Sequence, residues 1–168
     1  MRVLRFAIAI LWVCSLRADQ HSVDSDADTN FTQFHSFAIR QGDLTSKRPE
    51  LSGPLVRQRI EEAIRSELAA KGLRLDEQRP DLIVNYRLGA ADRREIERTR
   101  VGRFGRGVRQ TVTKFTEGTL VIDLVQREDR TLVWRGIYTD EEGDAVKLSK
   151  KLTDDIKKLF QEYPPKKK

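Results

Sequence analysis

The sequence predicts an α+β fold, a single domain in which an antiparallel β-sheet carries two α-helices on one face. Two long segments, near residues 53–71 and 147–163, show apolar residues at helical spacing. Other runs are rich in β-branched and apolar residues and alternate with the two-residue period of strands. Because strands and helices do not alternate regularly along the chain, the pattern favours an antiparallel sheet over a parallel one.

The chain is long enough for one domain, and its charge is unevenly distributed. Its 168 residues suffice for a single core, and its apolar runs argue against wholesale disorder. The net charge is +6, but residues 87–114 alone hold nine Lys or Arg against three Asp or Glu. With a basic tail at residues 166–168, this segment sits on an otherwise acidic body. The overall basicity is therefore weak evidence for a nucleic-acid partner.

Residues 1–18 have the composition of a secretory signal segment. Two arginines precede an apolar run at residues 6–13, and Ala18 supplies a small residue at the end. The run is too short to span a bilayer. We expect export with cleavage after Ala18. A lipid anchor at Cys14 is the second route, and a buried first strand is the third interpretation.

The elements of the first half are predicted in order. Residues 19–30 form an acidic, turn-rich lead-in, and a strand ending at Ile39 follows it. A loop spans residues 41–54. The first helix is capped by Ser52 and ends at Gly72. Its apolar face consists of Val56, Ile60, Ala63, Ile64 and Leu68.

The second half supplies the remaining strands and the last helix. Strands are predicted at residues 82–88, 108–117, 118–125 and 131–139, and the last two read as a hairpin across a charged turn. The final helix ends before two consecutive prolines. One core is expected to unite seven residues from these elements: Ile60, Ile64, Ile122, Leu124, Trp134, Ile156 and Phe160.

Several sequence blocks occur in an order that resembles a known family. The blocks are Pro80-Asp81-Leu82-Ile83-Val84, Glu117-Gly118-Thr119-Leu120-Val121-Ile122-Asp123-Leu124 and Leu132-Val133-Trp134-Arg135-Gly136. This order is similar to the bacterial cell-envelope proteins grouped as domain of unknown function 4136, many of them lipoproteins. The resemblance covers residues 28–165 and implies an envelope location and an α+β fold, without an established activity. The Arg-rich segment before Thr116 and the bulky residues before Cys14 depart from the family pattern.

The basic segment contains the candidate site, an anion-binding loop made of Arg100, Arg103, Arg106 and Arg109. Arginine can contact phosphate or carboxylate groups through two N–H donors at once. Glycines at 102, 105 and 107 would give access, although their spacing matches neither Gly-rich phosphate fingerprint. A solvated, mobile loop is the preferred interpretation, and anion binding is the alternative. The expected partners are an unidentified envelope component, with anionic lipid or lipopolysaccharide as the candidate contact, and not nucleic acid.

No other pattern predicts catalysis, a cofactor or a metal site. Alternating oxygen-bearing residues resemble the opening of a calcium loop: Asp24, Asp26, Asp28 and Asn30. The positions that need Gly and Glu hold Thr29 and His35, so a solvated lead-in is the preferred interpretation. His21 and His35 lack metal-ligand spacing, and no nucleophile elbow occurs.

We therefore expect no enzyme but an exported, non-catalytic binding or scaffolding domain of the periplasm or outer membrane. The alternative is a small-ligand carrier with a groove between the sheet and the helices. The predicted organisation is a signal segment at residues 1–18, one domain at 19–165 and the basic tail at 166–168.

Overall fold

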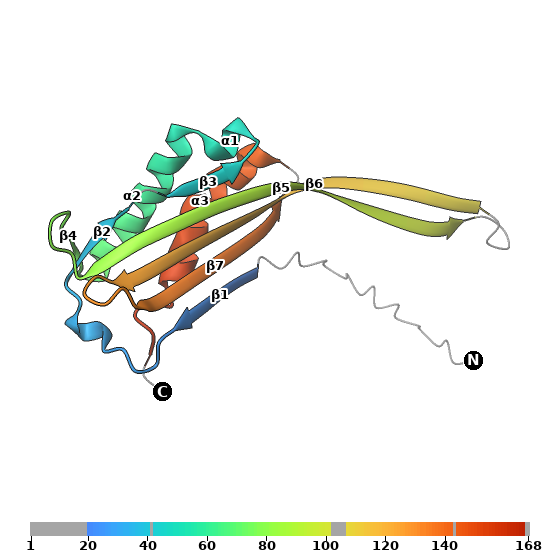
Figure 1. Cartoon of the computed structure of the whole chain (residues 1–168). Coiled ribbons are helices and arrows are strands. Elements are labelled where there is room, and N and C mark those ends of the chain that lie inside the picture. Colours follow the sequence, from blue (N-terminus) through green and yellow to red (C-terminus); the bar gives the residue numbers. More distant parts are fainter. Residues whose placement is uncertain (1–19, 41, 102–106, 143, 167–168) are drawn as a thin grey trace, which may run out of the picture.

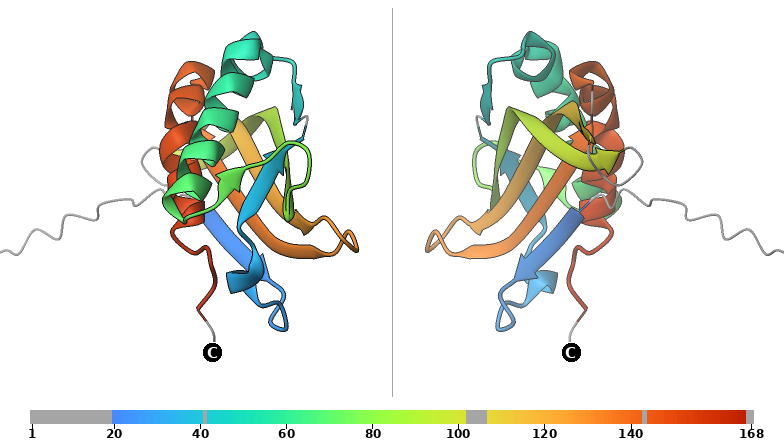
Figure 2. Two further views of the ribbon diagram at one scale, coloured as in Figure 1. Left: turned by 90° about the vertical axis from the view of Figure 1, so that its left-hand side faces the viewer. Right: turned by 90° about the vertical axis from the view of Figure 1, so that its right-hand side faces the viewer.

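The computed structural model describes residues 20–40, 42–101, 107–142 and 144–166, so the predicted signal segment lies outside it. Helices lie against one face of a mixed β-sheet (Figures 1 and 2). The strands are β1 (Gln20–Ser25), β2 (Ser36–Ile39), β3 (Asp43–Ser46), β4 (Arg74–Leu75), β5 (Leu82–Val101), β6 (Gly107–Gln126) and β7 (Leu132–Glu142). The helices are η1 (Phe31–Gln33, a 3₁₀ turn), α1 (Pro49–Ser52), α2 (Pro54–Ala70) and α3 (Ala145–Phe160).

The α+β class is confirmed, but the expectation of a purely antiparallel sheet is wrong. The strand order is β1-β7-β6-β5-β2-β4, and β3 also pairs with β5. The pairs β1–β7, β7–β6 and β6–β5 are antiparallel, whereas β2 and β3 are parallel to β5 and β4 is parallel to β2. Parallel neighbours need a long crossover, usually a helix. Helix α2 lies between β2 and β5 in the chain and supplies this crossover.

Several predicted boundaries change in the structure. The runs at 108–117 and 118–125 belong to one strand, β6, while the predicted hairpin between β6 and β7 is confirmed. The predicted loop at 41–54 contains β3 and α1, and the acidic lead-in contains β1. The first helix is capped by Gly53, because Ser52 ends α1 and its hydroxyl donates to a backbone carbonyl.

One hydrophobic core lies between the sheet and the two long helices. It contains all seven residues that the sequence predicted to share a core, so this prediction is confirmed. The five apolar positions predicted for the first helix are buried on α2. On α3 the stripe of Leu148, Leu152, Ile156, Leu159 and Phe160 is buried as well.

Two glycines from the family-like blocks allow α3 to approach the sheet closely. A Cβ at Gly118 would lie 2.5 Å from Cδ2 of Leu148 on α3. A Cβ at Gly136 would lie 2.6 Å from the ring of Trp134 and 3.3 Å from Leu159. The distances of 2.5 Å and 2.6 Å are too short for real carbon contacts. Glycine at these two positions therefore leaves room for Leu148 and Trp134.

Asp81 ties the beginning of β2 to the beginning of β5. Its carboxylate accepts hydrogen bonds from the backbone N–H groups of His35 (2.8 Å) and Ser36 (3.0 Å), and its own N–H donates to the Ser36 hydroxyl (3.0 Å). Burial opposes ionisation, but these donors outweigh it and hold the pKa of Asp81 below its usual value. The Pro80-Asp81 block therefore fixes the parallel junction of β2 with β5.

Replacing Asp81 by Ala should lower the free energy of unfolding by about 1–3 kcal/mol, since two backbone donors lose their acceptor. D81N keeps one oxygen acceptor and should cost less. Because the pKa is lowered in the folded state, the stabilisation is present above the usual value of 3.8 and is lost as the pH falls through the lowered pKa. Urea unfolding at pH 7 measures the effect. An Ala variant as stable as the wild type would contradict it.

Candidate functional site

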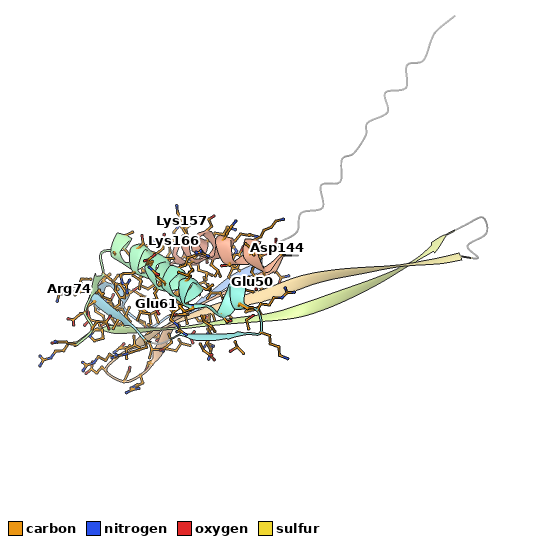
Figure 3. All side chains as sticks on the ribbon, turned by 90° about the horizontal axis from the view of Figure 1, so that it is seen from above. Glu50, Glu61, Arg74, Asp144, Lys157 and Lys166 are labelled. Atoms are coloured by element: carbon orange, nitrogen blue, oxygen red, sulfur yellow. The ribbon has the colours of Figure 1, made fainter. Side chains whose placement is uncertain are left out.

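A two-stranded arm projects from the body of the domain. Strands β5 and β6 pair along their whole lengths, but β3 pairs with β5 only as far as Ala90, and β7 pairs with β6 only as far as Thr116. Beyond these points, residues 91–101 and 107–115 form the arm. Within the described part of the chain, each arm strand pairs only with the other, and Figures 1 and 3 show the arm clear of the helices.

The arm is long for a ribbon without neighbours. At about 3.4 Å per residue, residues 91–101 extend roughly 35 Å from the body. An isolated two-stranded hairpin is marginally stable in water, because it has no third strand or helix to pack against. Within the described chain the arm therefore depends on its own cross-strand pairing.

Two of the candidate arginines, Arg100 and Arg109, fall at the far end of the arm. Arg100 on β5 lies opposite Val108, and Arg109 on β6 lies opposite Thr99. Arg103 and Arg106 lie outside the described residues. The predicted basic loop is therefore a strand pair for most of its length, because cross-strand hydrogen bonding continues to Val101 despite the high charge of the sequence.

The arm combines both signs of charge, with an excess of positive charge. Residues 91–101 contain four arginines and three acidic residues. Residues 107–115 contain Arg109 and Lys114 and no acidic residue, and Arg103 and Arg106 add two more positive charges between the strands.

The base of the arm is anchored by a second, smaller hydrophobic cluster. It joins Leu51 of α1 with Ala145 and Leu148 of α3, and Ala90 of β5 packs against it. Leu148 also covers Gly118, as described above. The arm therefore leaves the body at a point that α1 and α3 hold together.

Two polar residues of the family-like blocks, Asp123 and Arg135, are partners of each other. Asp123 lies opposite Arg135 in the β6–β7 register and accepts hydrogen bonds from Nε (2.6 Å) and Nη2 (2.9 Å) of Arg135. These bonds raise the pKa of Arg135. Nη2 of Arg87 lies 3.6 Å from the same carboxylate. Trp134 is fully buried and stacks on Phe160.

The acidic lead-in and the histidines show no ligand set. Asp26 accepts hydrogen bonds from the Asp28 N–H and the Thr29 hydroxyl, which fold its carboxylate into a local turn. His21 lies 3.2 Å from Glu162, and His35 is exposed and not the half-buried packing residue that a strand entry suggests. In the described ranges, no three His, Cys, Asp or Glu side chains could hold a metal ion together.

A buried polar cluster between α3 and β7 was missed by the sequence analysis. Asp140 of β7 and Asp155 of α3 are 4% and 1% exposed. Lys151 Nζ forms an ion pair with Asp140, whereas Lys158 Nζ lies 3.9 Å from Asp155 Oδ1 and 3.3 Å from the Tyr138 hydroxyl. The sequence feature that could have predicted this cluster is Asp155, which lies within the apolar stripe of the last helix.

Burial dominates the electrostatics of Asp155. It raises the pKa of this carboxyl from 3.8 to about 6, although the Tyr138 hydroxyl and Lys158 favour the ionised form. Asp140 contributes in the same direction as burial, because its charge repels a second negative charge. Neither carboxylate oxygen of Asp155 accepts a hydrogen bond of ordinary geometry, although the Tyr138 hydroxyl lies near enough to favour the ionised form.

Surface hollows lie at the strand ends and on the helix-free face of the sheet. One of about 410 Å³ is lined by residues of the β2, β5 and β6–β7 ends, including Phe34, Asp81 and Arg127. Another of about 220 Å³ adjoins Arg87 and Asp123. Their charged linings include groups that already have structural partners.

No helix in the described ranges is long and apolar enough to cross a membrane.

Comparisons with known proteins identify a family and a fold. The family model described as "Domain of unknown function (DUF4136)" matches residues 21–165. No curated protein gave a match. A solved PDZ domain protein from Parabacteroides distasonis is similar, with a TM-score of 0.63 and 17% identity; the similarity covers 89% of this chain and 36% of that one. The chain thus spans little more than a third of that protein's length.

Two further solved structures are similar over nearly their full length. The PelC dodecamer from Paraburkholderia phytofirmans has a TM-score of 0.50 and 14% identity, covering 83% of this chain and 94% of that one. A putative neuraminyllactose-binding hemagglutinin homolog from Helicobacter pylori has a TM-score of 0.51 and 12% identity, covering 86% and 94%. At these identities the likeness establishes the fold alone.

Proposed function

Since the chain belongs to the family of domain of unknown function DUF4136, we propose that it is a non-catalytic binding or scaffolding domain of the bacterial cell envelope. The proposed location follows from the signal-like composition of residues 1–18. Cleavage after Ala18 would release a soluble periplasmic protein, and lipidation at Cys14 would attach it to a membrane.

The arm is the observation that carries this proposal. It extends β5 and β6 beyond every other strand and helix of the described chain, and its base is anchored by α1 and α3. A rigid body with a projecting ribbon can bridge to a second surface without an enclosed pocket. The net positive charge of the arm favours an anionic surface, and the proposed contact is a phosphate-bearing lipid headgroup or lipopolysaccharide.

The core argues for a scaffold over a small-ligand carrier. The space between the sheet and the helices is filled by buried side chains from both layers, among them Phe37, Tyr86, Trp134 and Phe160. A carrier would need a concave site in this layer. Two hollows of the described surface lie outside this layer, one at the strand ends near Asp81 and one on the helix-free face of the sheet near Arg87.

Binding to anionic vesicles tests the proposed contact. Replacing Arg100, Arg103, Arg106 and Arg109 by Gln should weaken binding to phosphatidylglycerol vesicles at least tenfold at low salt, because each basic residue near such a surface contributes about 1 kcal/mol. The difference should shrink with added salt, since the screening length is about 8 Å at physiological ionic strength. Co-sedimentation of the chain from residue 19 with vesicles, and separately with lipopolysaccharide, measures the effect.

A matched variant separates the arm from overall charge. Four exposed cations of the body, Arg40, Lys71, Arg74 and Arg79, are replaced by Gln to give the same net charge as the arm variant. This control should bind nearly as well as the wild type, and thermal unfolding should confirm that both variants are folded. Equal weakening by the two variants, or none by the arm variant, would refute a contact through the arm.

A further inference from the structure

We propose that the contact between α3 and β7 is a proton-binding joint, in which the buried Asp155 carboxyl takes up a proton and α3 then docks more tightly against β7. The geometry carries this inference. The Asp155 carboxyl is 1% exposed, accepts no hydrogen bond of ordinary geometry and lies near a second buried carboxyl, Asp140, on the strand against which α3 packs.

The groups around Asp155 do not neutralise it fully. Lys158 Nζ lies 3.9 Å from Asp155 Oδ1 and also contacts the hydroxyl and the ring of Tyr138. Lys151 forms an ion pair with Asp140. An ionised carboxylate in this position loses its hydration, and the nearby charges offset this desolvation penalty only in part. The protonated form avoids that cost, and its burial is consistent with a pKa of about 6.

Several charged groups near α3 have separate partners. On β1, His21 lies opposite Tyr138 and contacts Glu162. On α2, Arg59 donates to the Ser149 hydroxyl and carbonyl at the earlier end of α3. Figure 3 shows Asp144 and Lys157 at the two ends of α3; Asp144 caps the helix by accepting from Val146 N–H.

The direction of the pH effect follows from the raised pKa. If the carboxyl has its usual pKa of 3.8 when α3 is undocked, the stabilisation is fully present below pH 3.8 and is lost as the pH rises through about 6. The fraction of molecules with α3 undocked should rise about tenfold between pH 5 and pH 8. Because Leu148 of α3 also holds the base of the arm, the joint links pH to the anchoring of the arm.

Hydrogen exchange of the α3 backbone tests the joint. Protection factors of residues 145–160, corrected for the intrinsic pH dependence of exchange, should fall about tenfold from pH 5 to pH 8 in the wild type. D155N should remove this difference and keep the higher protection at both pH values. D154N changes the neighbouring exposed aspartate and should behave like the wild type.

Two further measurements keep the outcome unambiguous. H21Q should retain the pH dependence, and its loss there would assign the effect to the His21–Glu162 pair and overturn the proposal. Carbon-13 NMR of the wild-type chain should show the Asp155 carboxyl titrating with a midpoint near 6. A midpoint at or below 4, or protection of α3 that is the same at pH 5 and pH 8, would also overturn it. None of these readouts depends on the anionic-surface contact.

Discussion

Replacing Trp134 by Ala should lower the free energy of unfolding by about 3–5 kcal/mol. The indole is fully buried, lies 5.2 Å from the Phe160 ring in a stacked arrangement and meets Tyr163 edge-on at 5.9 Å. It also occupies the space that Gly136 leaves open. Removing it would leave a cavity between β7 and α3 that the surrounding rings cannot fill without moving.

The measurement is urea unfolding followed by far-ultraviolet circular dichroism, since the variant loses the buried fluorophore. W134F retains a ring against Phe160 and should cost clearly less than W134A. A small domain has about 5–15 kcal/mol of total stability, so W134A would consume a large share of it. A loss below 1 kcal/mol for W134A would show that the ring is not part of the core.

The helices and the central strands could be predicted because their apolar patterns are local. On α2 and α3 the apolar residues recur at helical spacing, and the residues so identified are buried. Strand β7 and the second half of β6 alternate clearly and are joined by a short turn. In these segments the pattern within one window of sequence is enough to define the element.

The edge strands could not be predicted because their pairing is distant. Strand β1 contains Val23 as its only aliphatic residue, and it forms by pairing with β7, more than a hundred residues away in the chain. Strand β3 has four residues, and its order depends on β5. The parallel placement of β2 could have been inferred from the helix that separates it from β5.

The candidate site was predicted in part. The sequence identified the basic segment but not its form, because arginine and glutamate in residues 91–101 obscure the alternation of a strand that is held by the register with β6. Whether Arg100 and Arg109 bind an anion remains a proposal. The buried Asp155 was overlooked because it follows the exposed Asp154, and two adjacent aspartates in an amphipathic helix resemble exposed positions until the opposing strand is placed.

Replacing a buried core side chain of either long helix by Ala should lower the free energy of unfolding by about 2–5 kcal/mol. Exposed positions on the same helices provide the comparison. Ile64 of α2 and Ile156 of α3 are fully buried, so I64A and I156A remove methyl and methylene groups from the layer between helices and sheet. Leu55 of α2 and Val146 of α3 are 74% and 45% exposed. L55A and V146A should therefore change stability by less than about 0.5 kcal/mol.

The four variants together test the orientation of both helices. Urea unfolding at pH 5 and pH 7 gives the free energies, and the lower pH keeps the charge of Asp155 from adding to the effect of I156A on the same helix. If each buried variant loses several times more stability than its exposed partner, α2 and α3 face the sheet as described. Comparable losses for I156A and V146A would mean that α3 is rotated about its axis, and the packing of Leu148 on Gly118 at the base of the arm would then be wrong as well.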